Sequence, residues 1–291
     1  MKILIIPDVH GNWPETIEYI KAHKDEAEKV VLLGDYVDDF ERSKTGLPMI
    51  NGITEMFSLA RAEPEKFEVL LGNHDYQYIA GKMYSGYSPN FRSKYQKLFM
   101  DNIDLLKVAV ELDGWVFSHA GFSSTWCTKH GINSDIFGDF EKTRYGMSQE
   151  EWISMCVSTR VNKIFQNAFT SEERRDDLEI FEHTIGVDDF YGSGDTKRAS
   201  PIWIRPTALL GDMHFPQQIV GHTEIYFPPF ALTNKRGEKL IVIDSPEHNC
   251  YTFFDTENPI ECHTLDECNR IQKKKLKERN DELSRLGQKN K

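Results

Sequence analysis

The sequence has no long run of apolar residues. Its longest apolar stretches, such as residues 2–7, are far shorter than the roughly 20 residues that a membrane-spanning helix needs. The run at 2–7 follows Met1 directly and has the β-branched character of a strand rather than of a secretory leader. We therefore expect neither a transmembrane segment nor a signal peptide.

Cysteine, glycine and proline are all sparse. Five cysteines, an odd number without CxxC spacing, occur in 291 residues, which excludes a small disulfide-stabilised scaffold and favours reduced thiols in the cytoplasm. The 19 glycines and 12 prolines are too few for a collagen-like or low-complexity chain. With 39% hydrophobic and 12% aromatic residues, the composition is that of a globular protein.

Basic residues are few outside the last part of the chain. The net charge is −11, but the segment from Arg270 to Lys291 holds nine basic and three acidic residues. Residues 1–269 then carry 26 basic and 43 acidic residues, so general nucleic-acid binding is not expected. A polyanion could still bind locally if metal ions supplied the positive charge.

The apolar runs predict an α/β fold. Buried strands are expected at 2–7, 29–33 and 67–71, with helices between them at 15–23 and 53–60, which is typical of βαβ units around a parallel sheet. Later runs with short, turn-like connections indicate antiparallel additions, and hence a mixed sheet, at 108–112, 115–118, 218–220, 240–243 and 251–254.

No Pro-, Gly- or Ser-rich linker divides the chain, so we expect one domain over residues 1–265. Residues 123–200 form an insertion in this domain. The capping-box spacing of Ser148 and Glu151 predicts a helix there that continues to about Ala168. Residues 266–291 follow as a basic tail, in which charged residues surround sparse apolar positions. That pattern favours a solvated helix.

A polar cluster follows each of five predicted strands. The clusters are DVHGN at 8–12, GDYVDD at 34–39, GNHD at 72–75, SHAG at 118–121 and GHT at 221–223. Ligands of open parallel sheets bind beyond the carboxyl ends of the strands, so these clusters should converge on one place.

The side chains of these clusters offer oxygen and nitrogen donors and no thiolate. Such a mixture suits manganese, iron or zinc and argues against a soft-metal site. Carboxylates can bridge two ions, and neutral imidazoles bind through a ring nitrogen. Together the clusters offer six such side chains: two Asp, one Asn and three His. One ion that also leaves coordination positions open for substrate and water does not need six protein ligands, so the clusters indicate two divalent ions.

The five blocks in this order resemble the calcineurin-like metallophosphoesterases, and GDYVD with GNH resembles the phosphoprotein phosphatase branch. The resemblance spans Asp8 to about Asp244. It implies a sandwich of two mixed β-sheets flanked by helices, with a two-metal centre of manganese, or of iron or zinc. Carried over residue by residue, it assigns Asp8 and His10 to the first ion, Asp35 to both, and Asn73, His119 and His222 to the second.

The resemblance also implies the catalytic residues. In the family, hydroxide between the two metals attacks phosphorus, the His of GNH protonates the leaving oxygen and the second Asp of GDxVD orients that His; here these are His74 and Asp38. The chemistry is consistent, because a leaving alkoxide needs a proton from a group that titrates near neutral pH. A neighbouring carboxylate would stabilise the imidazolium form.

The sequence departs from the branch at the residue that usually grips phosphate. GDxVD is usually followed by Arg-Gly, whereas this chain has Asp39 and Phe40. Arg42 or Arg205 could replace the missing guanidinium. The segment Trp203-Ile204-Arg205 is similar to the W-x-R segment of bacterial-type phosphatases, so we favour Arg205.

These features leave the substrate open between a phosphoprotein and a nucleotide. The leading hypothesis is a metal-dependent phosphomonoesterase resembling serine/threonine protein phosphatases. GNHD instead of GNHE, and HAG instead of HGG, are more similar to diadenosine tetraphosphate hydrolases, which makes a dinucleoside polyphosphate or nucleotide-cap hydrolase the alternative. A phosphodiesterase or nuclease fits the acidic body less well. A non-catalytic metal-binding regulatory module is the hypothesis from another class, motivated by Asp39.

Two further features carry less weight. The aromatic residues between Tyr76 and Phe99 could stack on a nucleobase, but aromatic packing onto the sheet explains them equally simply. His214 and His248 lie outside the blocks and are not assigned to the site.

Overall fold

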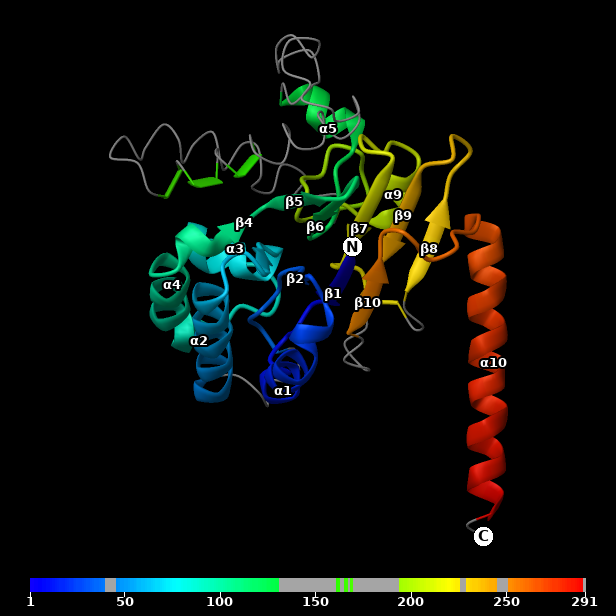
Figure 1. The fold of residues 1–291 in the computed structure, drawn as a ribbon, viewed down its shortest axis with the longest axis horizontal. Helices are drawn as coiled ribbons and strands as arrows, with labels where there is room; N and C mark the ends of the chain where they lie inside the picture. Colours follow the sequence, from blue (N-terminus) through cyan, green and yellow to red (C-terminus); the bar gives the residue numbers. More distant parts are fainter. Residues whose placement is uncertain are drawn as a thin grey trace.

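The computed structural model describes residues 1–39, 46–130, 161–162, 165–166, 168–169, 194–225, 229–244 and 251–289. In these ranges the chain forms two five-stranded mixed sheets, with helices packed on the outside (Figure 1). This arrangement confirms the predicted α/β sandwich of two mixed sheets.

The first sheet contains the N-terminal βαβ units, in the strand order β10-β1-β2-β3-β4. Strands β1 to β4 pair in parallel, whereas β10 pairs antiparallel with β1. The strand bounds are β1 Lys2–Ile6, β2 Lys29–Leu32, β3 Phe67–Leu70, β4 Leu106–Lys107 and β10 Thr252–Asp255.

Helices connect these parallel strands and cover the outer face of the first sheet (Figure 1). Helix α1 (Trp13–His23) and the 3-10 turn η1 (Lys24–Glu26) lead to β2, and α2 (Leu47–Ala62) leads to β3. The connection from β3 to β4 comprises α3 (Asn73–Ala80), η2 (Pro89–Phe91), α4 (Arg92–Met100) and η3 (Ile103–Leu105).

The second sheet has the order β5-β6-β7-β9-β8. Its strands are β5 Ala109–Leu112, β6 Trp115–Ser118, β7 Gln217–Val220, β8 Phe230–Thr233 and β9 Lys239–Val242. Two described helices, α5 (Ser124–Lys129) and α9 (Pro206–Leu210), lie between β6 and β7 in the chain. Asp113 and Gly114 join β5 to β6 with φ angles of 54° and 80°, as a two-residue hairpin turn requires.

The prediction that the later strands are antiparallel additions is only partly correct. β5 and β6 pair antiparallel, as does β10 with β1, but β6, β7 and β9 pair in parallel. β8 runs antiparallel to β9 on the sheet edge, so β9 returns beside β7 in the same direction. The sequence did not predict β8, because two prolines precede its four residues, and proline near a strand is tolerated mainly at an edge.

The strands alternate their side chains between two apolar layers. Ile3 and Ile5 of β1 point between the sheets, where they pack in one cluster with Phe117, Ile219 and Ile241 of the second sheet. The intervening residues of β1 point the other way and pack in a second cluster with the helices. A third cluster, with α9, covers the outer face of the second sheet. This period of two decides which side chains of a strand face the other sheet and which face the helices.

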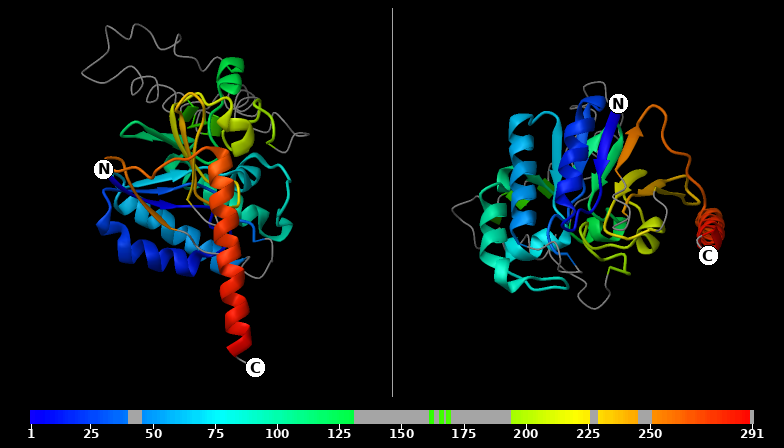
Figure 2. Two further views of the ribbon diagram at one scale, coloured as in Figure 1. Left: turned by 90° about the vertical axis from the view of Figure 1, so that its right-hand side faces the viewer. Right: turned by 90° about the horizontal axis from the view of Figure 1, so that it is seen from below.

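The insertion and the tail differ in how much of each is described. Most of the predicted helix at 148–168 lies outside the described residues, but residues 161–162, 165–166 and 168–169 are helical. Helix α10 (Leu265–Lys289) begins beside β8, and most of its length extends away from the two sheets (Figures 1 and 2). It begins at the proposed domain boundary, although the division itself stays a prediction. Cys268 attaches the first turns of α10 to β8, because its thiol donates to the carbonyl oxygen of Ala231 at 3.1 Å.

Among the described residues, none of the helices combines the length and the apolar character that crossing a membrane would require.

The close contact between α1 and α2 gives a test of the packing. A Cβ atom at Gly52 would lie 2.2 Å from Cβ of Trp13, which is fully buried. Gly52→Ala should therefore lower the free energy of unfolding by about 1–3 kcal/mol in urea denaturation, despite the better helix propensity of alanine.

Gly211→Ala is the matched control. Gly211 has no atom within 4 Å of the added Cβ and an ordinary φ of −85°, so this change should leave stability nearly unaltered. Equal stability of the two variants would contradict the packing described.

Candidate active site

Apart from Arg205, the predicted site residues follow the carboxyl ends of five strands, three in the first sheet and two in the second. Asp8 and His10 follow β1, Asp35 and Asp38 follow β2, Asn73 and His74 open α3 after β3, His119 follows β6, and His222 follows β7. Hydrogen bonds and close contacts link all of these side chains into one cluster. The βαβ connections of the first sheet and the parallel β6–β7 pair of the second bring these ends to the same edge of the sandwich.

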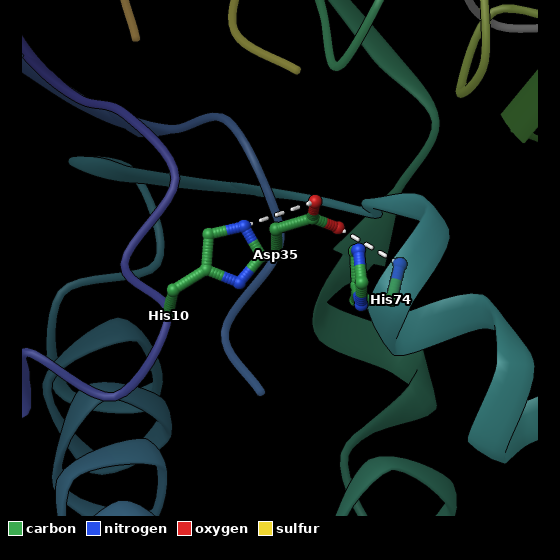
Figure 3. Close-up of side chains that lie close together, drawn as sticks. All are labelled: His10, Asp35 and His74. Carbon is green, nitrogen blue, oxygen red and sulfur yellow. Dashed lines mark hydrogen bonds and ion pairs between the residues drawn. The ribbon is translucent and has the colours of Figure 1, made fainter. Parts of the chain in front are cut away.

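Asp35 lies in the middle of the cluster. Its Oδ2 is 3.6 Å from Nε2 of His10 and 3.4 Å from Nε2 of His119. Its Oδ1 accepts a hydrogen bond of 2.9 Å from the backbone N–H of His74 (Figure 3). One carboxylate therefore contacts residues from three different loops.

Two groups of potential metal ligands share Asp35. In one group the ligand atoms of His10, Asp35 and His74 all lie within 4.8 Å of one another. In the other, the same holds for Asp35, His119 and His222. Asp8 joins the cluster through His222, because its carboxylate accepts from the backbone N–H of that residue at 3.2 Å.

Four site residues have a backbone conformation that non-glycine residues rarely adopt. They have positive φ angles of 41° at His10, 53° at Asp35, 66° at Asp38 and 61° at His222. Left-handed conformations cost free energy and persist where the surrounding fold imposes them, which occurs mostly at functional sites. Here the sharp turns aim polar side chains back over the strand ends.

Two glycines allow the carboxylates to approach the backbone. A Cβ atom at Gly72 would lie 2.1 Å from Oδ1 of Asp35, and one at Gly221 would lie 2.3 Å from Oδ1 of Asp8. Neither carboxylate could keep its place beside a larger residue.

Each candidate histidine ligand donates one ring N–H to a backbone carbonyl group. His10 donates from Nδ1 to Asp38 at 2.8 Å, His119 from Nδ1 to Leu33 at 2.8 Å, and His222 from Nε2 to Trp203 at 3.0 Å. Such bonds fix the tautomer and the ring orientation of metal-binding histidines. The lone pair is left on Nε2 of His10 and His119 and on Nδ1 of His222.

The surroundings of His119 require a positive charge. Its Nε2 lies 2.9 Å from Oδ1 of Asn73 and 3.4 Å from Oδ2 of Asp35, both of which are electron-pair donors. Burial alone would lower the pKa of His119, but the carboxylates of Asp35 and Asp8 raise it to about 10, so a proton occupies the place of a cation. The donor set thus fits a divalent ion.

The other ligand candidates are also consistent with cation binding. Burial raises the pKa of Asp8 to about 7, since its charged form lacks solvation. Burial acts in the same direction on Asp35, but the imidazoles of His119 and His74 outweigh it and hold the pKa of that carboxyl well below its ordinary value. Burial lowers the pKa of His222 far below its usual value, so this ring is neutral and can bind through its lone pair.

His74, which lies in one of these ligand groups, also pairs with Asp38. Nδ1 of His74 donates to Oδ2 of Asp38 at 3.0 Å. Burial alone would lower the pKa of His74, but Asp35 and Asp38 raise it above its ordinary value, which favours the imidazolium form. A protonated imidazole held by a carboxylate is suited to general acid catalysis.

The sequence analysis missed the residues that hold Asp38. The hydroxyl of Tyr78 donates to Oδ1 of Asp38 at 2.5 Å, and the side-chain amide of Gln77 donates to Oδ2. The loop after α3 holds the side chains of Tyr78 and Gln77 in place. The backbone N–H of Ser88 donates to the Tyr78 hydroxyl oxygen at 2.7 Å, and the backbone N–H of Tyr84 donates to Oε1 of Gln77 at 2.8 Å. No sequence pattern indicates that this loop turns back onto α3.

Asp75 is a second missed residue, and it joins the loop of Asp35 to the start of α3. Its carboxylate accepts from the backbone N–H groups of Asp35 and Tyr36 at 2.8 Å each and of Gly72 at 3.0 Å. The position of Asp75, three residues after the N-cap Gly72, is the signal that could have identified it.

Arg205 lies beside the cluster. Its Nη1 donates to the backbone carbonyl of His222 at 2.9 Å and to the hydroxyl of Thr223 at 3.2 Å. Asp39, in the position where the phosphatase branch usually has arginine, is 8% exposed. Phe40 and Arg42 lie outside the described residues.

The aromatic segment after GNHD mostly packs into the core. Tyr76, Tyr78, Tyr95 and Phe99 are all buried, which accounts for the aromatic pattern without a nucleobase. Tyr84 is partly buried, with its ring edge-on to Trp203 at 5.3 Å. His214 lies against Phe215 and has no contact with the cluster among the described residues, and His248 is outside them.

Comparisons of structure give remote similarities. The cold-active protein-tyrosine phosphatase of the psychrophile Shewanella sp. has 15% identity and a TM-score of 0.51 over 84% of this chain and 71% of that chain. A metallophosphoesterase from Sphaerobacter thermophilus has 14% identity and a TM-score of 0.41 over 95% and 93% of the two chains. A protein serine/threonine phosphatase from Saccharomyces cerevisiae has 14% identity and a TM-score of 0.40 over 84% and 67%.

At such low identity the Shewanella enzyme supports the fold only, and the two lower TM-scores support no conclusion. No curated protein sequence matches the chain. The family profile described as calcineurin-like phosphoesterase matches residues 1–226, which include every strand-end block of the cluster. The chain therefore belongs to the calcineurin-like phosphoesterases, a family of metallophosphoesterase hydrolases that use divalent metals and act on phosphorylated substrates.

Proposed function

We propose that this chain is a two-metal phosphomonoesterase that acts in the manner of serine/threonine protein phosphatases. The observation that carries the proposal is the position of the His74–Asp38 pair beside Asp35. Asp35 is the residue that belongs to both groups of potential metal ligands. A proton donor next to a binuclear site is what hydrolysis of a phosphomonoester with a poor leaving group requires.

The proposed metal ligands divide into two sets around Asp35. Asp8, His10 and Asp35 would hold one ion, and Asp35, Asn73, His119 and His222 the other. We propose manganese for both, with iron or zinc as alternatives, because the donors are oxygen and imidazole nitrogen. Bound divalent ions would polarise the phosphate group and lower the pKa of a water molecule.

The residues of the chain would then supply the proton and the orientation. Nδ1 of His74 is bound to Asp38, so Nε2 is the atom that would protonate the leaving oxygen. Asp38 keeps the ring in place, and Tyr78 and Gln77 keep Asp38 in place. We assign to Arg205 the binding of a phosphate oxygen, since it lies beside His222 and GDYVD is followed directly by Asp39 instead of arginine.

The comparisons do not favour the alternative of a dinucleoside polyphosphate hydrolase, and the burial of four side chains of the aromatic segment weakens one argument for it. We also propose a cytoplasmic location. The thiols of Cys127, Cys262 and Cys268 are free, in keeping with a reducing compartment.

A substrate panel with added Mn²⁺ tests the proposed reaction. We expect hydrolysis of p-nitrophenyl phosphate and of phosphoserine peptides, abolished by EDTA and restored by Mn²⁺. Much faster cleavage of diadenosine tetraphosphate than of phosphopeptides would contradict the protein-phosphatase assignment. Absence of turnover with every phosphoester would contradict the phosphomonoesterase proposal as a whole.

Metal removal should lower the stability of the protein. Ligands that bind only the folded state stabilise it, by about 2.7 kcal/mol at a hundredfold excess over Kd. Mn²⁺ added to EDTA-treated protein should therefore raise the thermal midpoint, measured by calorimetry, whereas the same buffer without Mn²⁺ should not. An unchanged midpoint together with no bound metal would contradict the assigned ligands.

Asp35→Asn and His74→Asn should fail in different ways. Asp35→Asn removes the shared negative charge, so both metal content and activity should fall. His74→Asn should retain both ions and lose only the proton donor, an effect of about 10²–10⁴-fold on kcat. The loss should be large for phosphoserine and much smaller for p-nitrophenyl phosphate, whose phenolate leaves without help.

Elemental analysis and kcat on the two substrates separate these roles. Loss of metal in His74→Asn, or equal losses on both substrates, would show that the general acid is another residue.

A further inference from the structure

Asp244 lies at the same edge of the sandwich as the metal-ligand candidates. β7 and β9 pair in parallel with Val220 opposite Val242, and the backbone N–H of Ile243 donates to the Val220 carbonyl at 2.7 Å. Continuing this register by two residues places Asp244 alongside His222. The backbone N–H of Ile225 donates to the Asp244 carbonyl at 2.9 Å, which fastens the loop of His222 against Asp244.

The carboxylate of Asp244 is buried without a partner for one oxygen. The residue is 4% exposed, and among the described residues Oδ1 has no hydrogen-bond donor. Buried carboxylates are almost always hydrogen-bonded, paired with a cation or bound to a metal. An unpartnered oxygen at this position therefore points to a missing positive ligand.

The charged groups that act most on Asp244 all belong to the candidate site. They are the carboxylates of Asp8 and Asp35 and the imidazoles of His10 and His119. Two buried carboxylates beside each other repel unless a cation compensates them.

The two sets of proposed ligands are unequal without this residue. The set of the second ion contains Asp35, Asn73, His119 and His222, whereas that of the first contains only Asp8, His10 and Asp35. Asp244 lies alongside His222, whose backbone N–H donates to the Asp8 carboxylate at 3.2 Å, so Asp244 would complete the smaller set.

We propose that Asp244 is an additional carboxylate of the metal centre and that it serves the divalent cation held by Asp8 and His10. The inference rests on the proposed two-metal function. It assigns to the chain a ligand group outside the five strand-end blocks, supplied by the loop after β9, which binds the ion directly or through one water molecule.

Asp244→Asn tests this role because it removes the charge and keeps the size of the side chain. Mn²⁺ is titrated into the metal-free full-length protein by calorimetry, with elemental analysis after dialysis. We expect one of the two ions to bind about 10- to 100-fold more weakly, the range found when residues that support metal ligands are changed. The metal-free variant should unfold at the same or a higher temperature than the metal-free wild type, because the repulsion with Asp8 is removed.

Glu68→Gln is the matched control. Glu68 is also a buried acid, at 5% exposure, but it pairs with Lys29 at 3.0 Å and Lys107 at 2.6 Å instead of the site residues. Its substitution should lower stability and leave both Mn²⁺ affinities unchanged. A purely structural role for Asp244 would give this same result.

The Mn²⁺ titrations of the wild type and of Asp244→Asn distinguish a failure of this inference from a failure of the proposed function. If the wild type binds two Mn²⁺ ions and Asp244→Asn binds both with unchanged affinity, the role of Asp244 is wrong and the two-metal function stands. If the wild type itself does not bind two ions, the proposed function fails first. Should Asp244→Asn not fold, Asp244→Ser is measured against the same criterion.

Discussion

The position of the Asp35 carboxylate is the constraint on which the site depends. Its backbone carbonyl accepts from the N–H of His10 at 3.0 Å, and its N–H donates to Asp75 at 2.8 Å, so the loop after β2 is fastened on both sides. Its side chain holds the first turn of α3 through the N–H of His74 and faces His119 across the sandwich. Both sheets must be assembled before these contacts exist, which makes the site a product of the whole fold.

The acidity of this cluster explains how metal and fold depend on each other. Asp8, Asp35 and Asp244 are all buried at one edge of the sandwich, in a body with a large excess of acidic residues. Without cations, protons must compensate these charges, as the raised pKa of Asp8 and of His119 indicates. Cation binding would then release protons and stabilise the folded chain, as in other proteins whose metal sites form only on folding. The hydrogen bond between the His10 N–H and the Asp35 carbonyl joins two turns that both have positive φ angles.

Most of the fold and the cluster could be predicted because the chemistry lies at strand ends. Parallel strands align their carboxyl ends, so the blocks after β1, β2 and β3 had to meet, and the resemblance added the second sheet. The side chains around Asp38 could not be predicted in this way. Gln77 and Tyr78 reach it only because the following loop folds back over α3, and such long-range contacts leave no local pattern. Asp244 follows an apolar strand with an ordinary sequence, and its proposed role emerges from its register with His222 and from its buried, unpartnered oxygen.

Anomalous diffraction at the manganese edge, from crystals of Mn²⁺-loaded protein, tests the central claim most directly. The account predicts two peaks that share the Asp35 carboxylate, one of them beside Asp8 and His10 and the other beside His119 and His222. A single peak, or two peaks of which only one touches Asp35, would contradict it.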